Sequence, residues 1–84
     1  MNASHRKTLK AVFADPVNGN IEWRKIEALL KASGCGIIEG GGSRVAVVFG
    51  DMKATFHRPH PGKEALRYRV NAVRDFLKAI GVKP

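Results

Sequence analysis

The chain has one cysteine, no long hydrophobic run and few acidic residues, and each shortage excludes a class of protein. Cys35 cannot form an internal disulfide, and with three histidines it gives no recognisable zinc-binding spacing. The longest apolar stretch, residues 45–49, is far too short to cross a membrane. Residues 1–10 are polar and basic, without the apolar segment of a secretion signal. We therefore expect a cytoplasmic protein with no membrane partner.

The length and the composition predict one packed domain over residues 1–84. A chain of 84 residues can bury one modest core, and two cores would leave each half too small to be stable. Hydrophobic residues make up 44% and charged residues 26%, which is ordinary for a globular protein. Disorder and fibrous repeats are therefore not expected.

The charge is strongly positive and unevenly distributed. Fifteen Lys and Arg residues stand against seven Asp and Glu, a formal charge of +8. Residues 1–42 hold six basic and four acidic residues, whereas residues 43–84 hold nine basic and three acidic residues. The second half therefore carries most of the excess. Such a charge attracts polyanions, with nucleic acid as the common partner and an acidic protein as the alternative.

The first third of the chain predicts two helices. Residues 4–14 have the pattern of a short helix with Ser4 as its N-cap. After a turn, Asn20 is placed to cap a second helix that runs to residue 33 and ends at Gly34. Trp23 lies on the apolar face of that helix and is expected in the core.

The middle of the chain predicts three antiparallel strands. Residues 35–39 form a short strand candidate, followed by a glycine-rich loop. Gly50-Asp51 is a two-residue turn between the β-rich runs 44–49 and 52–57. With this turn, the residue numbers of each cross-strand pair add up to 101. The register places Val45 opposite Phe56, Val47 opposite Ala54 and Phe49 opposite Met52 on the core face. It places Arg44 opposite His57 on the other face.

The last third predicts a long helix over residues 63–80. Apolar residues recur there at helical spacing, at Leu66, Val70, Val73, Leu77 and Ile80. Beside this stripe, at about 100° per residue, lies a basic flank made of Arg67, Asn71, Arg74 and Lys78. The element order is therefore α-α-β-β-β-α, an α+β fold with helices on one face of a three-stranded antiparallel sheet.

Three short stretches carry a family resemblance over residues 21–82. They are Ala-Leu-Leu-Lys-Ala-Ser-Gly at 28–34, the Gly42-Ser43 step, and His-Pro-Gly-Lys-Glu at 60–64. In these stretches, and in the order of its elements, the chain resembles the HicA family of toxins from bacterial toxin–antitoxin pairs. The resemblance implies a double-stranded-RNA-binding-like fold, cleavage of messenger RNA, and neutralisation by a HicB-type antitoxin. Residues 4–14 lie outside the pattern.

The sequence departs from the family at one position that matters for catalysis. The Gly-Ser-His signature of the family, which contains its catalytic histidine, reads Gly42-Ser43-Arg44 here. Arginine stays protonated, so it can bind phosphate but is a poor proton shuttle. The family has a histidine that matches His60, while His57 is a feature of this sequence.

Metal-independent RNA cleavage needs a base, an acid and positive charge near the phosphate. We interpret His57 as the catalytic imidazole, moved across the hairpin from position 44, with Arg44 supplying charge and His60 as a second proton-transfer group. The alternatives are a surface histidine at His57 and a loop-ordering role for His60. No third ligand accompanies these histidines, so neither a metal nor another cofactor is expected.

Basic and polar residues around this predicted site could follow an RNA backbone. The predicted RNA contacts are Ser43, Lys53, Arg58, Lys63, Arg67, Asn71, Arg74 and Lys78. Two alternatives to an endoribonuclease stay open: a catalytically impaired module that binds only RNA or its antitoxin, and an interaction protein for an acidic partner.

Overall fold

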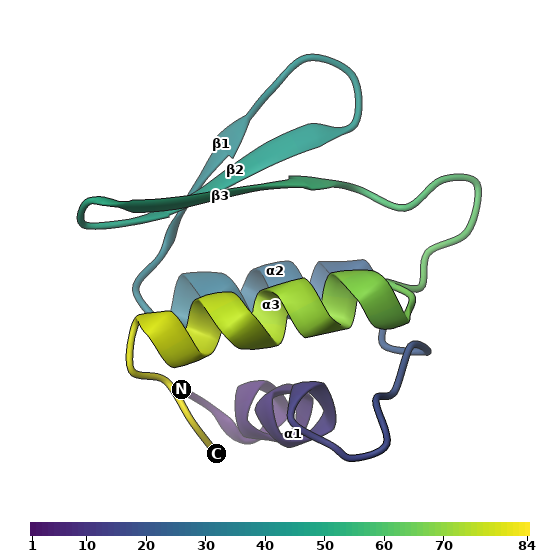
Figure 1. Cartoon of the computed structure of the whole chain (residues 1–84), viewed down its shortest axis with the longest axis vertical. Coiled ribbons are helices and arrows are strands. Elements are labelled where there is room, and N and C mark those ends of the chain that lie inside the picture. The colour runs from purple at the N-terminus through teal and green to yellow at the C-terminus, as the bar shows by residue number, and fades with distance from the viewer.

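The computed structural model describes all 84 residues and contains three helices and three strands (Figure 1). The elements are α1 (Ala3–Val12), α2 (Trp23–Ala32), β1 (Gly36–Glu39), β2 (Arg44–Phe49), β3 (Met52–His57) and α3 (Arg67–Ala79). The predicted α+β class and the order α-α-β-β-β-α are confirmed. No helix is long and apolar enough to cross a membrane.

The sheet has the order β1-β2-β3, and both strand pairs are antiparallel. The predicted register is confirmed from the Arg44–His57 pair to the Phe49–Met52 pair. Val45, Val47 and Phe56 are buried against the helices, as the two-residue period requires. At the hairpin tip the prediction of a core face is wrong, because Phe49 and Met52 are 37% and 38% exposed. Figure 1 shows this tip reaching beyond the helix pair that covers the rest of the sheet.

The molecule has three layers. The sheet packs on α2 and α3, and α1 lies on the far side of this helix pair (Figure 1). One core cluster of 16 buried residues joins all three layers. In it the rings of Trp23 and Phe56 lie 5.4 Å apart between centroids, which confirms that both are core residues. The outer face of the sheet carries no helix.

The first two helices begin at different residues from those predicted. Asn2, not Ser4, caps α1, because its side chain accepts a hydrogen bond from the His5 N–H and the His5 ring accepts one from the Asn2 N–H. Helix α2 begins at Trp23 after Glu22, so Asn20 is not its cap.

Helix α3 starts four residues later than predicted, because residues 63–66 pair with the segment before α2. The Trp23 N–H donates to the Lys63 carbonyl at 2.9 Å, and the Ala65 N–H donates to the Ile21 carbonyl at 2.8 Å. Leu66, expected in the apolar stripe, is 51% exposed and has a φ of 70°, where the chain turns into α3. Pairing with the segment before α2 thus replaces the first predicted helical turn.

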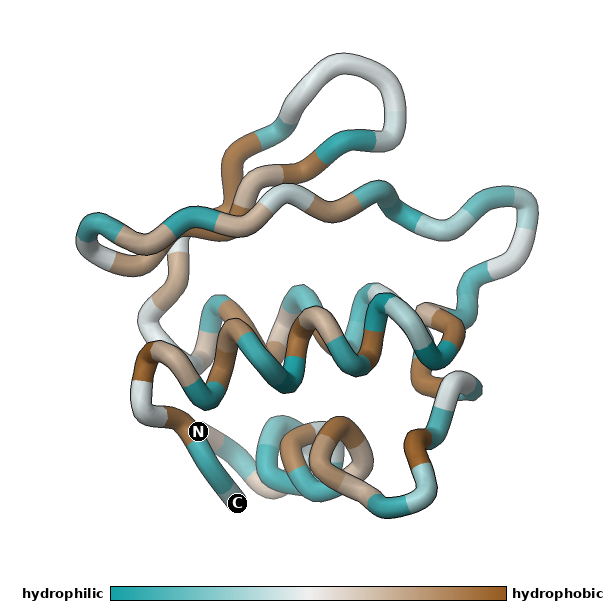
Figure 2. The backbone as a smooth tube through the Cα atoms, in the orientation of Figure 1, coloured by the Kyte–Doolittle hydropathy of each residue, from teal (hydrophilic) through white to brown (hydrophobic).

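The hydropathy of the backbone follows these layers (Figure 2). Hydrophobic and hydrophilic residues alternate along α2 and α3, so each helix turns one apolar side to the core. The segment that follows β3 is hydrophilic. Arg44, His57 and His60, the predicted catalytic residues, lie at this end of the sheet and in the segment after it.

Candidate functional site

Arg44 and His57 are cross-strand partners at one end of the hairpin. Both are exposed and belong to the residue set that faces away from the helices. The prediction that they are neighbours is therefore confirmed. The Arg44 Nε–H donates to the Gly41 carbonyl at 3.4 Å, so the guanidinium lies against the loop between β1 and β2.

That loop leaves backbone donors unused. The Gly40 N–H donates to the Arg44 carbonyl at 2.9 Å, and the Arg44 N–H donates to the Gly41 carbonyl at 3.2 Å. The N–H groups of Gly41, Gly42 and Ser43 between them have no backbone acceptor. Consecutive free amides next to a guanidinium suit an anion.

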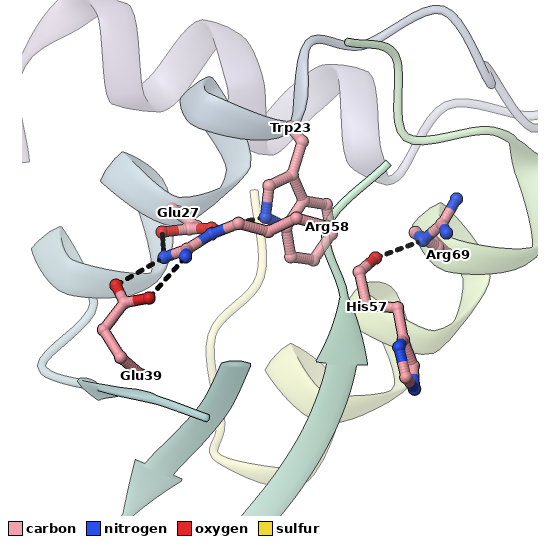
Figure 3. A network of polar contacts seen from close by, with 6 residues as sticks. All are labelled: Trp23, Glu27, Glu39, His57, Arg58 and Arg69. Carbon is pink, nitrogen blue, oxygen red and sulfur yellow. Dashed lines mark hydrogen bonds and ion pairs between the residues drawn. The ribbon is translucent and has the colours of Figure 1, made fainter. Parts of the chain in front are cut away.

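Arg69 holds the end of β3 on α3. Its Nε–H donates to the His57 carbonyl at 2.6 Å, and an Nη1–H donates to the Ala65 carbonyl at 3.2 Å. Figure 3 shows the guanidinium at the His57 backbone, with the imidazole directed elsewhere. Arg69 therefore fixes the backbone that carries His57 and adds a positive charge beside it.

Two hollows, one lined by His57 and the other by His60, share two lining residues. Tyr68 and Arg69 line both of them: one hollow also contains Thr55, His57 and Ala72, and the other contains His60 and its flanking prolines. We call the group Arg44, His57, His60, Tyr68 and Arg69 the β3–α3 corner. Sequence reasoning missed Tyr68 and Arg69. Helical spacing could have indicated Arg69. It places this arginine on the side of α3 opposite the basic flank, beside Ala72 and Phe76.

Arg58 points to the opposite side from His57, toward α2. Its Nε–H donates to Glu27 at 2.7 Å, and its terminal N–H groups donate to Glu39 at 2.5 and 2.8 Å (Figure 3). Glu27 also accepts a hydrogen bond from the Trp23 indole N–H. We call these four residues the Arg58 brace. It links the end of β3 to α2 and to β1. Arg58 was expected to contact RNA, but its guanidinium is bound to these two glutamates.

The charges of the Arg58 brace stabilise one another. Hydrogen bonds from Arg58 are the main cause that lowers the pKa of Glu27 and of Glu39 from the ordinary value of 4.5. The same contacts, first with Glu39 and then with Glu27, raise the pKa of Arg58. Two carboxylates around one guanidinium leave no positive charge there for a phosphate.

The predicted basic flank of α3 faces away from the β3–α3 corner. The Arg74 Nε–H donates to the Val12 carbonyl at 2.9 Å, and an Nη2–H donates to the Ala14 carbonyl at 2.7 Å. Arg74 therefore caps the end of α1. Arg67, Asn71 and Lys78 are exposed on the same flank. The structure does not bring them together with Arg44 and His57.

The remaining predicted contacts lie at different distances from the corner. Ser43 is exposed directly before Arg44, and its carbonyl accepts the Arg58 N–H at 2.9 Å. Lys53 shares a face of β3 with His57 and lies four residues away, about 13 Å along the strand. Lys63 forms an ion pair with Glu22 at 3.4 Å.

No three His, Cys, Asp or Glu side chains are grouped to hold a metal ion.

Arg74→Ala is expected to lower the free energy of unfolding by about 1 kcal/mol, because two charge-assisted hydrogen bonds to the end of α1 are lost. Lys78→Ala, on the same flank but exposed, should change it by less than about 0.5 kcal/mol. Urea denaturation of both variants measures the difference. Equal effects would mean that Arg74 does not hold α1 in place.

The fold and the corner define a class of protein: a small basic α+β domain of the double-stranded-RNA-binding-like kind, with exposed polar residues at one end of its sheet. The sequence model of one family, described as the HicA toxin of bacterial toxin–antitoxin pairs, matches residues 23–82. The chain belongs to the HicA toxin family. It is thus a toxin of a toxin–antitoxin system, and its partner is an antitoxin.

The match begins at the first residue of α2, so α1 lies outside it, as expected from the resemblance. No curated protein and no solved structure matches the chain.

Proposed function

We propose that this toxin is an endoribonuclease that binds messenger RNA at the β3–α3 corner and cleaves it without a metal ion. The observation that carries the proposal is the pairing of Arg44 with His57 on the open face of the sheet. The pairing puts the positive charge of Arg44 next to the imidazole of His57. The resemblance aligns the family histidine with position 44, so the imidazole lies on the opposite strand of the hairpin.

The proposed reaction is an attack by the RNA on its own backbone. His57 takes the proton of a 2′-hydroxyl, and the 2′-oxygen forms a bond to the adjacent phosphorus. The bond from phosphorus to the 5′-oxygen breaks, and His60 gives that oxygen a proton. Arg44 stabilises the charge that develops on the phosphate. The products are a 2′,3′-cyclic phosphate and a 5′-hydroxyl.

The electrostatics of the outer sheet face support RNA as the ligand. The strand residues on this face include Arg44, Lys53 and His57 and no acidic side chain. Arg69 and the free amides of Gly41 to Ser43 add donors at the same end of the sheet. Phosphates that these groups neutralise would release counterions, so binding should weaken as salt rises.

The exposed part of the basic flank lies on another side of α3 and offers a longer RNA a second, separate set of contacts. Arg67, Asn71 and Lys78 are free to contact a backbone that continues around α3. Arg58 and Arg74, in contrast, already bind partners within the chain.

We assign the antitoxin to the HicB type, with an acidic surface that covers the corner. The net charge of +8 supports an acidic partner. Such a partner would occupy Arg44 and His57 and so block access of RNA.

One observation favours a second candidate, a module that binds RNA or its antitoxin without cleaving. By the resemblance of the Gly42-Ser43-Arg44 step to the family signature, Arg44 takes the position of the catalytic histidine, and a guanidinium cannot exchange protons at cellular pH.

Incubating a long RNA with the wild type and with Arg44→Ala in EDTA separates the two candidates. Shortened RNA with wild type, and much less with Arg44→Ala, supports the nuclease. Intact RNA in both lanes, with mobility retarded by the wild type at low salt, favours the binding-only module. If the RNA is neither cut nor retarded, the proposed function is wrong.

A further inference from the structure

Tyr68 is the most exposed large apolar side chain of the protein, and the reaction described above does not use it. It is 63% exposed at the start of α3, whereas Val70, Val73 and Leu77 of the same helix are fully buried. The ring therefore contributes little to the core. Tyrosine is enriched at contact surfaces, because its ring is apolar and its hydroxyl stays in water.

The position of Tyr68 ties it to the corner. It lines the hollow that contains His57 and also the hollow that contains His60. A nucleotide bound in either hollow would therefore meet this ring in the wall of its site.

The ring is also held in place before any ligand arrives. The Arg69 guanidinium lies over it at 4.7 Å from the centroid, and two backbone carbonyls hold Arg69 in turn. This cation–π contact occupies one side of the ring and leaves most of the rest in solvent. A side chain ordered in advance loses less entropy when a ligand stacks on it.

We propose that Tyr68 stacks on the base next to the cleaved phosphate and thereby restricts the toxin to single-stranded RNA. This inference rests on the proposed function. A base inside a duplex is already covered on both faces by its neighbours, so only an unpaired base can present a face to Tyr68. Domains with a double-stranded-RNA-binding fold recognise the shape of a duplex. In this protein, stacking on Tyr68 would instead require an unpaired base at the corner.

The test measures binding of an uncleavable probe, a 2′-O-methyl RNA 12-mer, by fluorescence anisotropy. The probe is used alone and annealed to its complement. Tyr68→Ala should raise the Kd for the single strand about tenfold, because base stacking on an aromatic ring is lost, and should leave the Kd for the duplex unchanged. Tyr68→Phe keeps the ring and should bind like the wild type.

Leu66→Ala is the matched control, because Leu66 is 51% exposed and lines the same hollow as His60 without offering an aromatic face. Its Kd should stay near that of the wild type. The salt dependence of binding should be the same in Tyr68→Ala as in wild type, since no phosphate contact is removed. In Arg44→Ala the salt dependence should become weaker.

Three outcomes would overturn the inference. Wild-type affinity of Tyr68→Ala for the single strand would leave the proposed function intact and show that the ring does not stack on a base. An equal loss for single strand and duplex would show that the ring does not select between them. A wild type that binds neither probe would overturn the proposed function as well.

Discussion

His57→Ala is expected to cleave RNA about 10²- to 10⁴-fold more slowly than the wild type, the usual contribution of a general acid or base. The side chain is exposed and makes no hydrogen bond within the chain, while the backbone bond from Arg69 to the His57 carbonyl is independent of the imidazole. The variant should therefore fold normally and still bind RNA through Arg44 and Arg69. Initial rates in EDTA with a labelled RNA measure the loss.

Thr55→Ala is the control for this prediction. Thr55 is exposed on the same face of β3, two residues from His57, and has no assigned role in the reaction. It should keep the wild-type rate, and its thermal unfolding midpoint should fall only slightly, because alanine is less favoured in strands than threonine. Cleavage by His57→Ala at the wild-type rate would show that the imidazole has not moved across the hairpin.

Arg58→Met is expected to lower the free energy of unfolding by about 2 kcal/mol. The change removes hydrogen bonds to two carboxylates and leaves Glu27, whose side chain is only 13% exposed, without its cationic partner. Arg67→Met, at an exposed arginine without an ion pair, should change stability by less than about 0.5 kcal/mol. Urea denaturation measures both variants, with the slope against urea as the check on two-state behaviour.

A second variant shows whether the unpaired carboxylate causes the loss. Glu27→Gln combined with Arg58→Met should recover part of the stability, because no buried charge is then left unpaired. If Arg58→Met is as stable as Arg67→Met, the Arg58 brace does not stabilise the fold.

The Arg58 brace also predicts how stability depends on pH. Arg58 holds the pKa of Glu27 and of Glu39 below the ordinary value of 4.5. A carboxyl whose pKa is lower in the folded state adds stability above its unfolded pKa and loses it as pH falls through the folded value. Stability should therefore drop below about pH 4.5. The drop should be smaller in Arg58→Met.

Much of the sheet could be predicted from the sequence, because local rules decide it. Gly50-Asp51 defines a two-residue turn, and the turn fixes the register of every pair in the hairpin. That Arg44 and His57 are neighbours followed from this register alone. Only the burial at the hairpin tip was wrong, since the extent of the helices beneath Phe49 is not a local property.

Other features depend on contacts between distant segments. The start of α3 is decided by pairing of residues 63–66 with the segment before α2, and helical spacing cannot reveal that competition. The use of the basic flank depends on where α1 packs. Because α1 ends beside this flank, Arg74 donates hydrogen bonds to the carbonyls at the end of α1. Tyr68 and Arg69 joined the corner because the end of β3 lies against α3.

The sequence by itself therefore determined the fold class, the element order, the hairpin register and the family of this protein. Side-chain periods and turn chemistry act over a few residues, so they can be read along the chain. Only the tertiary structure decided which arginines are free and which are bound. The hydrogen bonds of Arg58 to Glu27 and Glu39 span 31 and 19 residues, and those of Arg74 to α1 and the following turn span about 60. Such pairings arise from packing between layers, and sequence spacing does not encode them.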